Sequence, residues 1–348
     1  MPAYRGEVAD QTLNHRVSAP ETLAPVAHPD VAWRSPTPED IDAIHAALVS
    51  ADEVDHPTWA FARGDVEDWF ELPQTTAEDL LVGETPEGRI VAVGAAIKQE
   101  DTSLEVRVSL QGAVVPDMRR RGLGTIVGRW QYDRALQLLA AETEATVDGV
   151  IEQYVHENDP GAAAIAGALG MTVGRWFVVM ERDLTEPVFE VEGDIEAGVV
   201  LVPLTADRVD DVRLARNDAF RDHWGSVPYS EEYWGSFTGS EHFSLELSTV
   251  AVIDGEVAAF CLVTVNEENW ERRGLPYAYI EYVGVVRAHR GKGLAPRVIR
   301  RTLRAMATSG LKATQLDVDT DSPTGANTLY ESLGFVERDR EQVFTRHY

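Results

Sequence analysis

One arrangement occurs twice in this chain of 348 residues and constrains its fold more than any other feature. An apolar strand runs into an arginine- and glycine-rich turn, and the turn runs into a helix. The first occurrence reads VRVSLQGAVVPDMRRRGLGTIVGRW and the second reads AYIEYVGVVRAHRGKGLAPRVIRR. Matching Arg119 to Arg290 gives an offset of 290 − 119 = 171 residues, which is close to half the chain. Such self-similarity indicates two tandem copies of one fold.

The turn of the second copy has the chemistry of a phosphate-binding loop. Ile280, Val283 and Val285 favour a buried strand before it, and Val298 and Leu303 recur at helical spacing after it. A turn of this kind leaves backbone N–H groups unpaired at the start of a helix, and its glycines let a polyanion approach them. The sequence therefore predicts a phosphate seat, although a plain surface turn between a strand and a helix would also use glycine.

Two well-known glycine loops do not fit this turn. The P-loop pattern G-x-x-x-x-G-K-[ST] is absent, and the dinucleotide pattern G-x-G-x-x-G fails because Pro296 and Arg297 follow Ala295. The remaining pattern, R-x-x-G-x-A after an apolar strand, resembles the acetyl-CoA pyrophosphate loop of the GNAT acetyltransferase family. Downstream, Ala326 begins an A-x-x-LY-x-x-LGF sequence that includes Tyr330 and is similar to the ending of GNAT proteins.

This resemblance implies a fold, a cofactor and a set of binding residues. The expected fold class is α/β, with a mixed sheet in each of two tandem GNAT folds. The expected cofactor is acetyl-CoA, with its pyrophosphate on the loop and its pantetheine arm along the central strand. The cofactor-binding residues so implied are Val283, Val285, Arg290, Gly291, Lys292, Gly293, Leu294, Ala295 and Asn327 in the second copy, and Arg119, Arg121, Gly122, Gly124 and Thr125 in the first.

The two copies differ in the groups that acetyl transfer needs. An amine must lose a proton, and the departing thiolate must gain one. The second copy offers Glu281 on its central strand and Tyr330, which in the GNAT family lies beside the thioester sulfur. The corresponding residues of the first copy are Leu110 and Ala166, at offsets of 171 and 164. We therefore predict that the C-terminal copy catalyses, as in the tandem GNAT subgroup that includes mycothiol synthase, and that the N-terminal copy is structural or holds a cofactor without turnover.

Each of these roles has a structural alternative. Glu281 could face solvent or pair with an arginine, and Tyr330 could serve packing alone. The loops around residues 218–234, an aromatic loop among them, are expected to set the identity of the acceptor substrate and to supply several side chains that contact it. These candidate substrate-binding residues are Asp218, His223, Trp224 and Tyr229, of which His223 could instead be structural.

Composition limits the partners of the protein. A net charge of −27 makes non-specific nucleic-acid binding improbable and favours a cationic substrate. No apolar run is long enough for a membrane span, and the N-terminus lacks the apolar segment of a secretory signal. A single cysteine, Cys261 in the apolar segment VAAFCLVTV, indicates a buried thiol and a reducing, cytoplasmic location. The histidines show no metal-ligand spacing, and the triplet starting at Asp317 lacks the glycine and glutamate of a calcium loop.

The expected organisation has four parts. Residues 1–30 form a flexible lead-in, 31–184 the N-terminal domain, 185–198 a linker and 199–348 the C-terminal domain. The expected activity is acetyl-CoA-dependent acetylation of a primary amine on a small, cationic molecule, by a monomer or a homodimer. Two alternatives stay open, mycothiol synthase, which acetylates cysteinyl-glucosaminyl-inositol, and a non-catalytic acyl-CoA-binding sensor.

Overall fold

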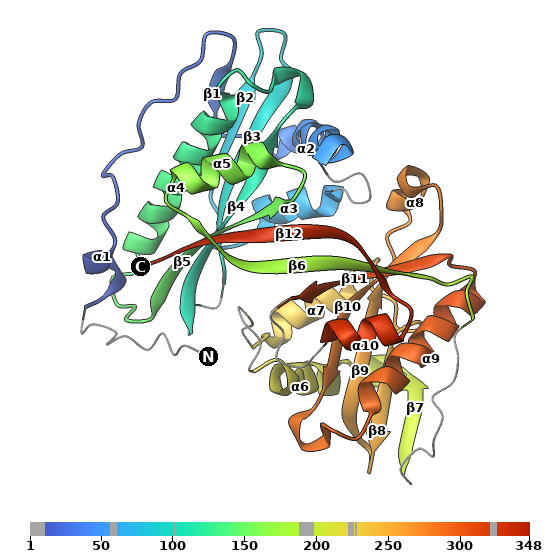
Figure 1. The fold of residues 1–348 in the computed structure, drawn as a ribbon. Coiled ribbons are helices and arrows are strands. Elements are labelled where there is room, and N and C mark those ends of the chain that lie inside the picture. Colours follow the sequence, from blue (N-terminus) through green and yellow to red (C-terminus); the bar gives the residue numbers. More distant parts are fainter. Residues whose placement is uncertain are drawn as a thin grey trace. The chain divides into compact units, whose positions relative to one another are not determined.

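The computed structural model describes residues 11–55, 61–100, 102, 104–187, 198–221, 226, 228–320 and 326–348. The chain divides into two compact units, and Figure 1 labels their elements along a chain coloured from its N-terminus to its C-terminus. Unit 1 comprises Met1–Trp176 and Arg340–Tyr348, and unit 2 comprises Phe177–Asp339. Each unit is a mixed sheet flanked by helices.

Unit 1 is built around six strands in the order β1-β2-β3-β4-β5-β12. Neighbours are antiparallel except the central pair, β4 and β5, which is parallel. Its elements are α1 (Leu13–Arg16), β1 (Ala32–Arg34), α2 (Ile41–Asp55), α3 (Arg63–Glu71), β2 (Leu80–Glu84), β3 (Ile90–Lys98), β4 (Glu105–Val114), α4 (Leu123–Ala140), β5 (Asp148–His156), α5 (Pro160–Ala168) and the end of β12 (Val336–His347).

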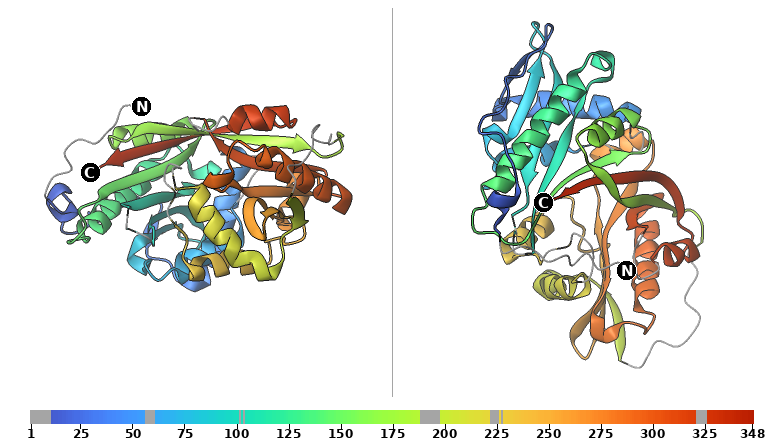
Figure 2. Two further views of the ribbon diagram at one scale, coloured as in Figure 1. Left: turned by 90° about the horizontal axis from the view of Figure 1, so that it is seen from below. Right: turned by 60° about the vertical axis from the view of Figure 1, so that its left-hand side comes forward.

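The helices of unit 1 cover both faces of its sheet. On one face α2 and α3 pack against β2 and β3 through Ile44, Leu48 and Trp69. On the other face α1, α4 and α5 pack against β4 and β5, as the two views of Figure 2 allow the reader to follow. Alternating side chains of the strands therefore supply two separate cores, one on each face.

Unit 2 repeats this topology. Its strand order is β6-β11-β10-β9-β8-β7, and its parallel central pair is β10 and β11. Its elements are β6 (Thr172–Asp183), β7 (Val199–Pro203), α6 (Val209–Ala219), α7 (Glu231–Gly239), β8 (Thr249–Ile253), β9 (Glu256–Thr264), α8 (Glu268–Arg273), β10 (Tyr277–Val285), α9 (Leu294–Ser309), β11 (Ala313–Asp319) and α10 (Ala326–Ser332), followed by the start of β12.

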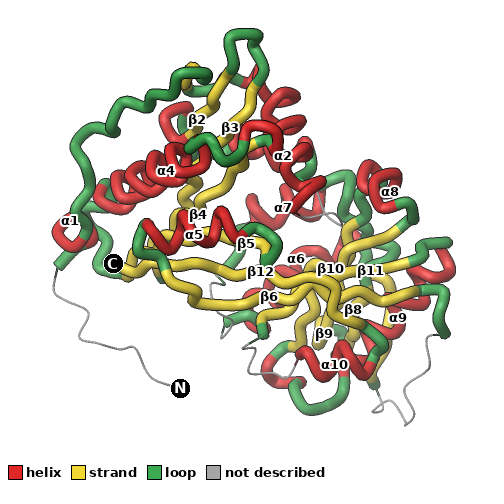
Figure 3. Tube along the Cα trace, turned by 45° about the horizontal axis from the view of Figure 1, so that its top comes forward, coloured by secondary structure: helices red, strands yellow, loops and turns green. Residues whose placement is uncertain are grey.

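Two cores also hold unit 2 together. One lies between the sheet and α9, with Val298, Leu303 and Met306 fully buried against β9, β10 and β11, and α10 packs on the same core. The other lies under α6 and α7 and includes Trp234 and Phe260. Figure 3 shows these helices in red and the strands in yellow. The predicted duplication of a mixed α/β fold is thus observed in both units.

The last strand of each half pairs in the opposite unit. Residues 177–183 of β6 pair with β11, and residues 341–347 of β12 pair with β5. The predicted domain boundaries were different: they assigned the end of β6 to the N-terminal domain, 31–184, and the end of β12 to the C-terminal domain, 199–348. Residues 177–184 therefore belong to unit 2 and 340–348 to unit 1. Sequence cannot show this exchange, because a strand with apolar alternation fits either sheet edge equally well.

Local predictions can be compared with the described residues. The order Thr37-Pro38-Glu39-Asp40 favours a capping box, and that box is present. The pair Asp254-Gly255 favours a type I′ hairpin turn, and the two residues have the positive φ values of such a turn, 52° and 88°. The expected flexible lead-in is partly wrong, because Leu13 is completely buried in a core of unit 1. The prediction of an aromatic loop is partly wrong as well, because the end of that segment forms the helix α7, Glu231–Gly239.

No helix in the described ranges combines the length and the apolar character that crossing a membrane would require.

Candidate active site

The central strands of unit 2 separate where chemistry was predicted. Strand β10 pairs with β11 only at Tyr277, Ala278 and Tyr279. Beyond that point β10 continues to Val285 and keeps its ladder to β9, so its edge towards β11 has no strand partner among the described residues. Backbone groups on such an edge are available to an extended ligand. The predicted pantetheine contacts, Val283 and Val285, lie on this stretch.

Glu281 is the extra residue of a β-bulge. The register of β10 against β9 shifts between Ile280 and Tyr282, so Glu281 has no direct partner across the ladder. Bulges re-aim side chains and are frequent beside active sites. Its carboxylate oxygen Oε1 accepts a hydrogen bond from the Thr264 hydroxyl at 2.7 Å. The hydroxyl therefore holds the carboxylate at the point where the strands separate, which argues against a freely solvated surface acid.

Tyr330 lies on α10 and packs against the α9 core. Its ring makes an edge contact with Phe335, with centroids 5.6 Å apart. Burial raises the pKa of the Tyr330 phenol above its usual value, and the nearby Cys261 thiol adds to the effect. The hydroxyl has no hydrogen-bond partner among the residues that the structure describes. It is therefore a neutral donor at physiological pH, as the proton donor to a thiolate must be.

The predicted phosphate loop leads into α9 as expected. Gly291 and Gly293 have φ of 78° and 67°, and a Cβ atom built on either glycine would meet nothing within 4 Å. The N-cap residue of α9 is Gly293, which has no side chain with which to cap the helix. Its first amides and the positive end of the helix dipole are therefore available to an anion. Leu294 is buried, so that residue can offer only its backbone.

Arg290 and Asn327 complete this region. One guanidinium nitrogen of Arg290 donates to the carbonyl of Ala219 at 2.8 Å, which leaves the side chain exposed beside the loop. The side-chain oxygen of Asn327 is buried and has no hydrogen-bond partner within the described residues. A buried polar atom of this kind is unusual unless a ligand satisfies it. The open loop and this orphaned amide oxygen both fit a ligand with a diphosphate and a polar arm, as in acetyl-CoA.

The predicted substrate-binding residues are only partly placed. His223 and Trp224 lie outside the described residues. Asp218 accepts a hydrogen bond from the backbone N–H of Arg287 at 2.9 Å, and so anchors α6 to the turn that precedes the loop. Tyr229 shares a 2.8 Å hydrogen bond with the Tyr282 hydroxyl.

An aromatic cluster surrounds Tyr229. The Arg216 guanidinium lies over its ring at 3.7 Å from the centroid, and Tyr282, Tyr233 and Trp234 are ring neighbours. Burial raises the pKa of the Tyr282 phenol, and the adjacent Tyr229 hydroxyl adds to this. These contacts show Tyr229 packing in a cluster beneath α6 and α7.

Asp317 and its hydrogen-bond donor Tyr279 were not predicted as residues of this region. Asp317 on β11 follows Gln315, the last residue paired with β10, by two positions, and it accepts a hydrogen bond from the Tyr279 side chain. Asp317 had been considered only as part of a calcium loop. The alternation Leu316-Asp317-Val318 could have identified it, because a carboxylate between two core residues lies on the opposite face of its strand.

Unit 1 lacks the corresponding features. Its central strand β4 pairs with β3 in one unbroken register from Val108 to Val114, without a bulge. Glu281 therefore has no counterpart there, and Leu110, the residue predicted to correspond, is buried in the core. Arg107 is buried and forms ion pairs with Glu105 and Glu152, which lie on β4 and β5.

The loop of unit 1 keeps the backbone shape of the loop in unit 2, but its first arginine has a strong ionic partner inside unit 1. Gly122, the N-cap residue of α4, has φ of 91° and no side chain with which to cap the helix. Arg119 makes a two-pronged ion pair with Asp55, at 2.7 and 2.6 Å, and also donates to the carbonyl of Val114. The strong pairing raises the pKa of the Arg119 guanidinium. Arg119 therefore ties α2 to the loop and is not available to a phosphate.

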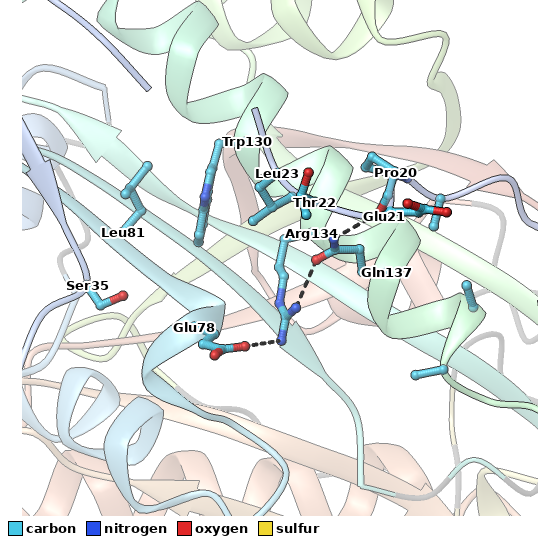
Figure 4. A pocket seen from close by; sticks show the side chains of 13 residues that line it. Pro20, Glu21, Thr22, Leu23, Ser35, Glu78, Leu81, Trp130, Arg134 and Gln137 are labelled. Carbon is cyan, nitrogen blue, oxygen red and sulfur yellow. Dashed lines mark hydrogen bonds and ion pairs between the residues drawn. The ribbon is translucent and has the colours of Figure 1, made fainter. Parts of the chain in front are cut away.

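A pocket of about 760 Å³ lies elsewhere in unit 1, between the 19–23 segment, β2 and α4. Figure 4 shows that its polar side chains contact one another. Arg134 interacts with Glu78 and Gln137, and Gln137 donates to the carbonyl of Pro20 at 2.9 Å. Because these polar groups already satisfy each other, we do not assign the pocket to catalysis.

Cys261 and the acidic side chains do not suggest other chemistry. Cys261 is completely buried, and burial raises the pKa of its thiol to about 12. Such a thiol is inert at neutral pH, as predicted. Within the described part of the chain, no group of three or more histidine, cysteine, aspartate or glutamate residues could hold a metal ion.

Comparisons with known proteins place this site in a family. Residues 209–335 match the sequence profile of the Acetyltransferase (GNAT) family. Mycothiol acetyltransferase from Thermobispora bispora is 31% identical over 234 residues, which cover 67% of this chain and 74% of the relative. Mycothiol acetyltransferase from Salinispora arenicola is also 31% identical, over 257 residues that cover 71% of this chain and 75% of the relative.

Solved structures share the fold of the whole chain. A GCN5-related N-acetyltransferase from Sphaerobacter thermophilus superposes with a TM-score of 0.69 at 23% identity, covering 94% of this chain and 97% of that one. A tandem GNAT protein from the clavulanic acid biosynthesis pathway gives a TM-score of 0.66 at 18% identity, covering 91% and 98%. The chain belongs to the GNAT acetyltransferases, as a tandem member that transfers an acetyl group from acetyl-CoA to an amine.

Proposed function

We propose that unit 2 acetylates a primary amine of a small cationic molecule and that unit 1 does not catalyse. The observation that carries this proposal is the bulge of β10, which places Glu281 where β10 and β11 separate. Tyr330 lies on the following helix, so one unit holds both a proton acceptor and a proton donor. Unit 1 has the same strand order without the bulge, and Leu110 and Ala166 are both buried there.

Each residue of unit 2 has a role in this proposal. Acetyl-CoA supplies the acetyl group as a thioester, and coenzyme A leaves as a thiolate when the C–S bond breaks. The amides of Gly293 and the start of α9 bind its diphosphate, with Arg290 and Lys292 adding positive charge. Glu281, directly or through a water molecule, takes a proton from the amine. A backbone N–H near Val283 stabilises the oxygen of the attacked carbonyl, and Tyr330 protonates the sulfur.

The charge of the site supports a cationic acceptor. Glu281 and Asp317 both lie on the face of the sheet opposite the α9 core, and the whole chain carries a net charge of −27. Carboxylates that remain ionised attract an ammonium ion and orient its nitrogen. A second candidate is the acceptor of mycothiol synthase, cysteinyl-glucosaminyl-inositol, which also carries a primary ammonium. The names of the relatives from T. bispora and S. arenicola favour it.

Kinetics of a Tyr330→Phe protein test the assignment. Removal of the phenol should lower kcat by roughly 10²- to 10⁴-fold, which is the usual contribution of a general acid. Tyr132→Phe is the matched control, because it removes a hydroxyl that only bonds Tyr348 within unit 1. The control should keep wild-type kcat. An unchanged kcat in Tyr330→Phe would remove Tyr330 from the mechanism.

The acceptor is identified by thiol release from acetyl-CoA with a panel of amines. The panel contains diamines, amino sugars and cysteinyl-glucosaminyl-inositol. Fast release with the last compound alone would establish the mycothiol synthase assignment. Tight acetyl-CoA binding without thiol release from any amine would instead support the acyl-CoA-binding sensor.

A further inference from the structure

Asp317 stands at the place where β10 and β11 part. The last residue of β11 that pairs with β10 is Gln315, opposite Tyr279, and Asp317 follows two positions later on the same strand. Leu316 and Val318 point into the α9 core, so Asp317 extends from the opposite face of the sheet. Strand geometry therefore directs its carboxylate to the face that also carries Glu281.

Tyr279 connects the two carboxylates. On its β11 side, the Tyr279 side chain hydrogen-bonds the Asp317 carboxylate. On its β9 side, the residue paired with Tyr279 is Thr264, and the Thr264 hydroxyl holds Glu281 at 2.7 Å. One tyrosine thus lies between two acids, each of which is oriented by a hydroxyl group. If Tyr279 and Thr264 only packed the sheet, their hydroxyl groups would not both need to donate to carboxylates.

The surroundings of Asp317 favour proton binding. Its side chain is reached by solvent yet is surrounded by protein atoms, and this desolvation raises the pKa of the carboxyl to about 6, with the Tyr279 hydrogen bond opposing the rise. Opposite it on β6 is the apolar Val179. Among the described residues, the other titratable or charged groups on this face include Glu281 and Tyr282 on β10, Asp319 on β11, Glu181 on β6, Arg216 on α6, Arg273 on α8 and Arg338 on β12.

Two of these arginines are already paired. Both Arg273 and Arg338 form ion pairs with Glu181, and Gln315 also donates to that carboxylate. Neither arginine is therefore a free counter-charge for Asp317. Within the part of the chain that the structure describes, Asp317 forms no ion pair, so its carboxylate can accept a proton from a positively charged substrate.

The proton balance of the reaction calls for such a group. Conversion of an ammonium ion to an amide removes two protons from nitrogen while the N–C bond forms and the C–S bond breaks. One proton equivalent ends on sulfur, supplied through Tyr330, and the other is released to solvent. A single carboxylate at Glu281 would have to accept both protons in turn.

We propose that Asp317 is a second proton-accepting residue, which binds the ammonium group of the acceptor and takes its first proton, while Glu281 takes the second. Tyr279 fixes the Asp317 carboxylate. This inference rests on the proposed function of unit 2 and adds a catalytic residue to it. The acceptor it implies is an amine that arrives protonated.

The test is the pH dependence of Asp317→Asn, with Glu256→Gln as the control. Glu256 is an exposed carboxylate at the start of β9, and its loss should leave the kinetics unchanged. Asp317→Asn should lower kcat by roughly 10²-fold or more, which is the lower range for a general base. The Michaelis constant for acetyl-CoA should stay within about twofold of the wild-type value. In the wild type, kcat/KM should decrease as the pH falls through about 6, because Asp317 becomes protonated, and this decrease is called the acid limb. In Asp317→Asn the acid limb should be absent.

Two further variants sharpen the result. Tyr279→Phe removes a hydrogen bond that stabilises the charged carboxylate, so the acid limb should move to higher pH. Asp317→Glu keeps the carboxyl group and should restore part of kcat while shifting the limb. If calorimetry shows that Asp317→Asn no longer binds acetyl-CoA, the pH profile of Asp317→Glu is the decisive measurement. An acid limb of kcat/KM at the wild-type pH in Asp317→Glu would then overturn the proposal.

The failure of this inference differs from failure of the proposed function. A wild-type protein that acetylates amines, together with an Asp317→Asn protein that keeps both kcat and the acid limb, overturns the inference and leaves Glu281 as the base. A wild-type protein that releases no thiol with any amine overturns the proposed function itself.

Discussion

The two units share a fold and differ where their central strands separate. In both, antiparallel strands flank one parallel pair, and a loop with two residues at positive φ begins the helix that follows. In unit 2 the central strand is bulged at Glu281 and pairs with its parallel neighbour at three residues. In unit 1 the strand is regular and pairs with β5 at five residues, with the Arg107–Glu152 ion pair between the strands.

The difference separates what the fold requires from what catalysis requires. Both loops keep the same backbone conformation, even though unit 1 has Arg120 at φ of 62° where unit 2 has Gly291. The positive φ is therefore a demand of the strand-to-helix connection. Among the described residues, the central strand is bulged in unit 2 and regular in unit 1, and the bulge accompanies the acid and the phenol. Catalytic function thus correlates with an irregular strand and not with the glycine loop.

Deletion of Glu281 should have the largest effect. Ile280 faces the α9 core and Tyr282 faces the α6 core, so without Glu281 the strand alternates regularly, as in unit 1. The shortened strand should fold and still lack the carboxylate, and kcat should fall by roughly 10²- to 10⁴-fold. Circular dichroism and thiol release on the same preparation measure the two properties separately.

A companion variant, Glu281→Gln, keeps the bulge and removes the charge. If the deletion protein were folded and fully active, the bulge would have no catalytic importance, and the contrast between the units would lose its meaning. If only the deletion were inactive, the bulge would act through geometry alone.

The next effect comes from the loops. Gly293→Val in unit 2 and Gly122→Val in unit 1 place a β-branched side chain at φ of 67° and 91°, in each case with open space around the new Cβ. The strain of about 1–2 kcal/mol favours other backbone conformations and turns the amides away from the diphosphate. The Gly293 variant should raise the Michaelis constant for acetyl-CoA by roughly 5- to 30-fold.

The Gly122 variant carries the same strain in unit 1 and serves as the matched control. Its kinetics should equal those of the wild type, while its thermal midpoint should fall as much as that of the Gly293 variant. Equal kinetic losses in both variants would show that unit 1 also contributes a cofactor site needed for turnover, contrary to the proposal.

Sequence was sufficient for the fold and for the loop. The repeat, the glycine turns and the hairpin turn at Asp254 and Gly255 follow from local chemistry, since positive φ and helix starts favour particular residues. The positions of Glu281 and Tyr330 followed from a resemblance to GNAT motifs. The match of residues 209–335 to the GNAT profile confirms that resemblance for unit 2.

The rest depends on contacts between distant segments. A bulge is a mismatch in residue count between two paired strands, so the sequence of β10 alone does not reveal the extra residue between Ile280 and Tyr282. The orientation of the Asp317 carboxylate depends on a hydrogen bond from Tyr279. Tyr279 lies 317 − 279 = 38 positions earlier in the sequence, and the pairing of β10 with β11 brings the two residues together. The exchange of β6 and β12 is likewise set by tertiary pairing. Alternation places side chains on a face but does not identify the neighbouring strand.

The smallest effect tests the loop of unit 1 directly. Arg120 is exposed and has a positive φ that costs a non-glycine residue about 1–2 kcal/mol. Replacement with glycine removes this strain but adds roughly 0.5–1 kcal/mol of chain entropy in the unfolded state. Arg120→Gly should therefore raise the urea midpoint slightly, by a net free energy of unfolding of about 1 kcal/mol or less, and leave the kinetics unchanged. A lower urea midpoint would mean that the Arg120 side chain stabilises unit 1 by more than its backbone strain costs. The positive φ would then be maintained by a side-chain contact in unit 1 and by the conformational freedom of Gly291 in unit 2.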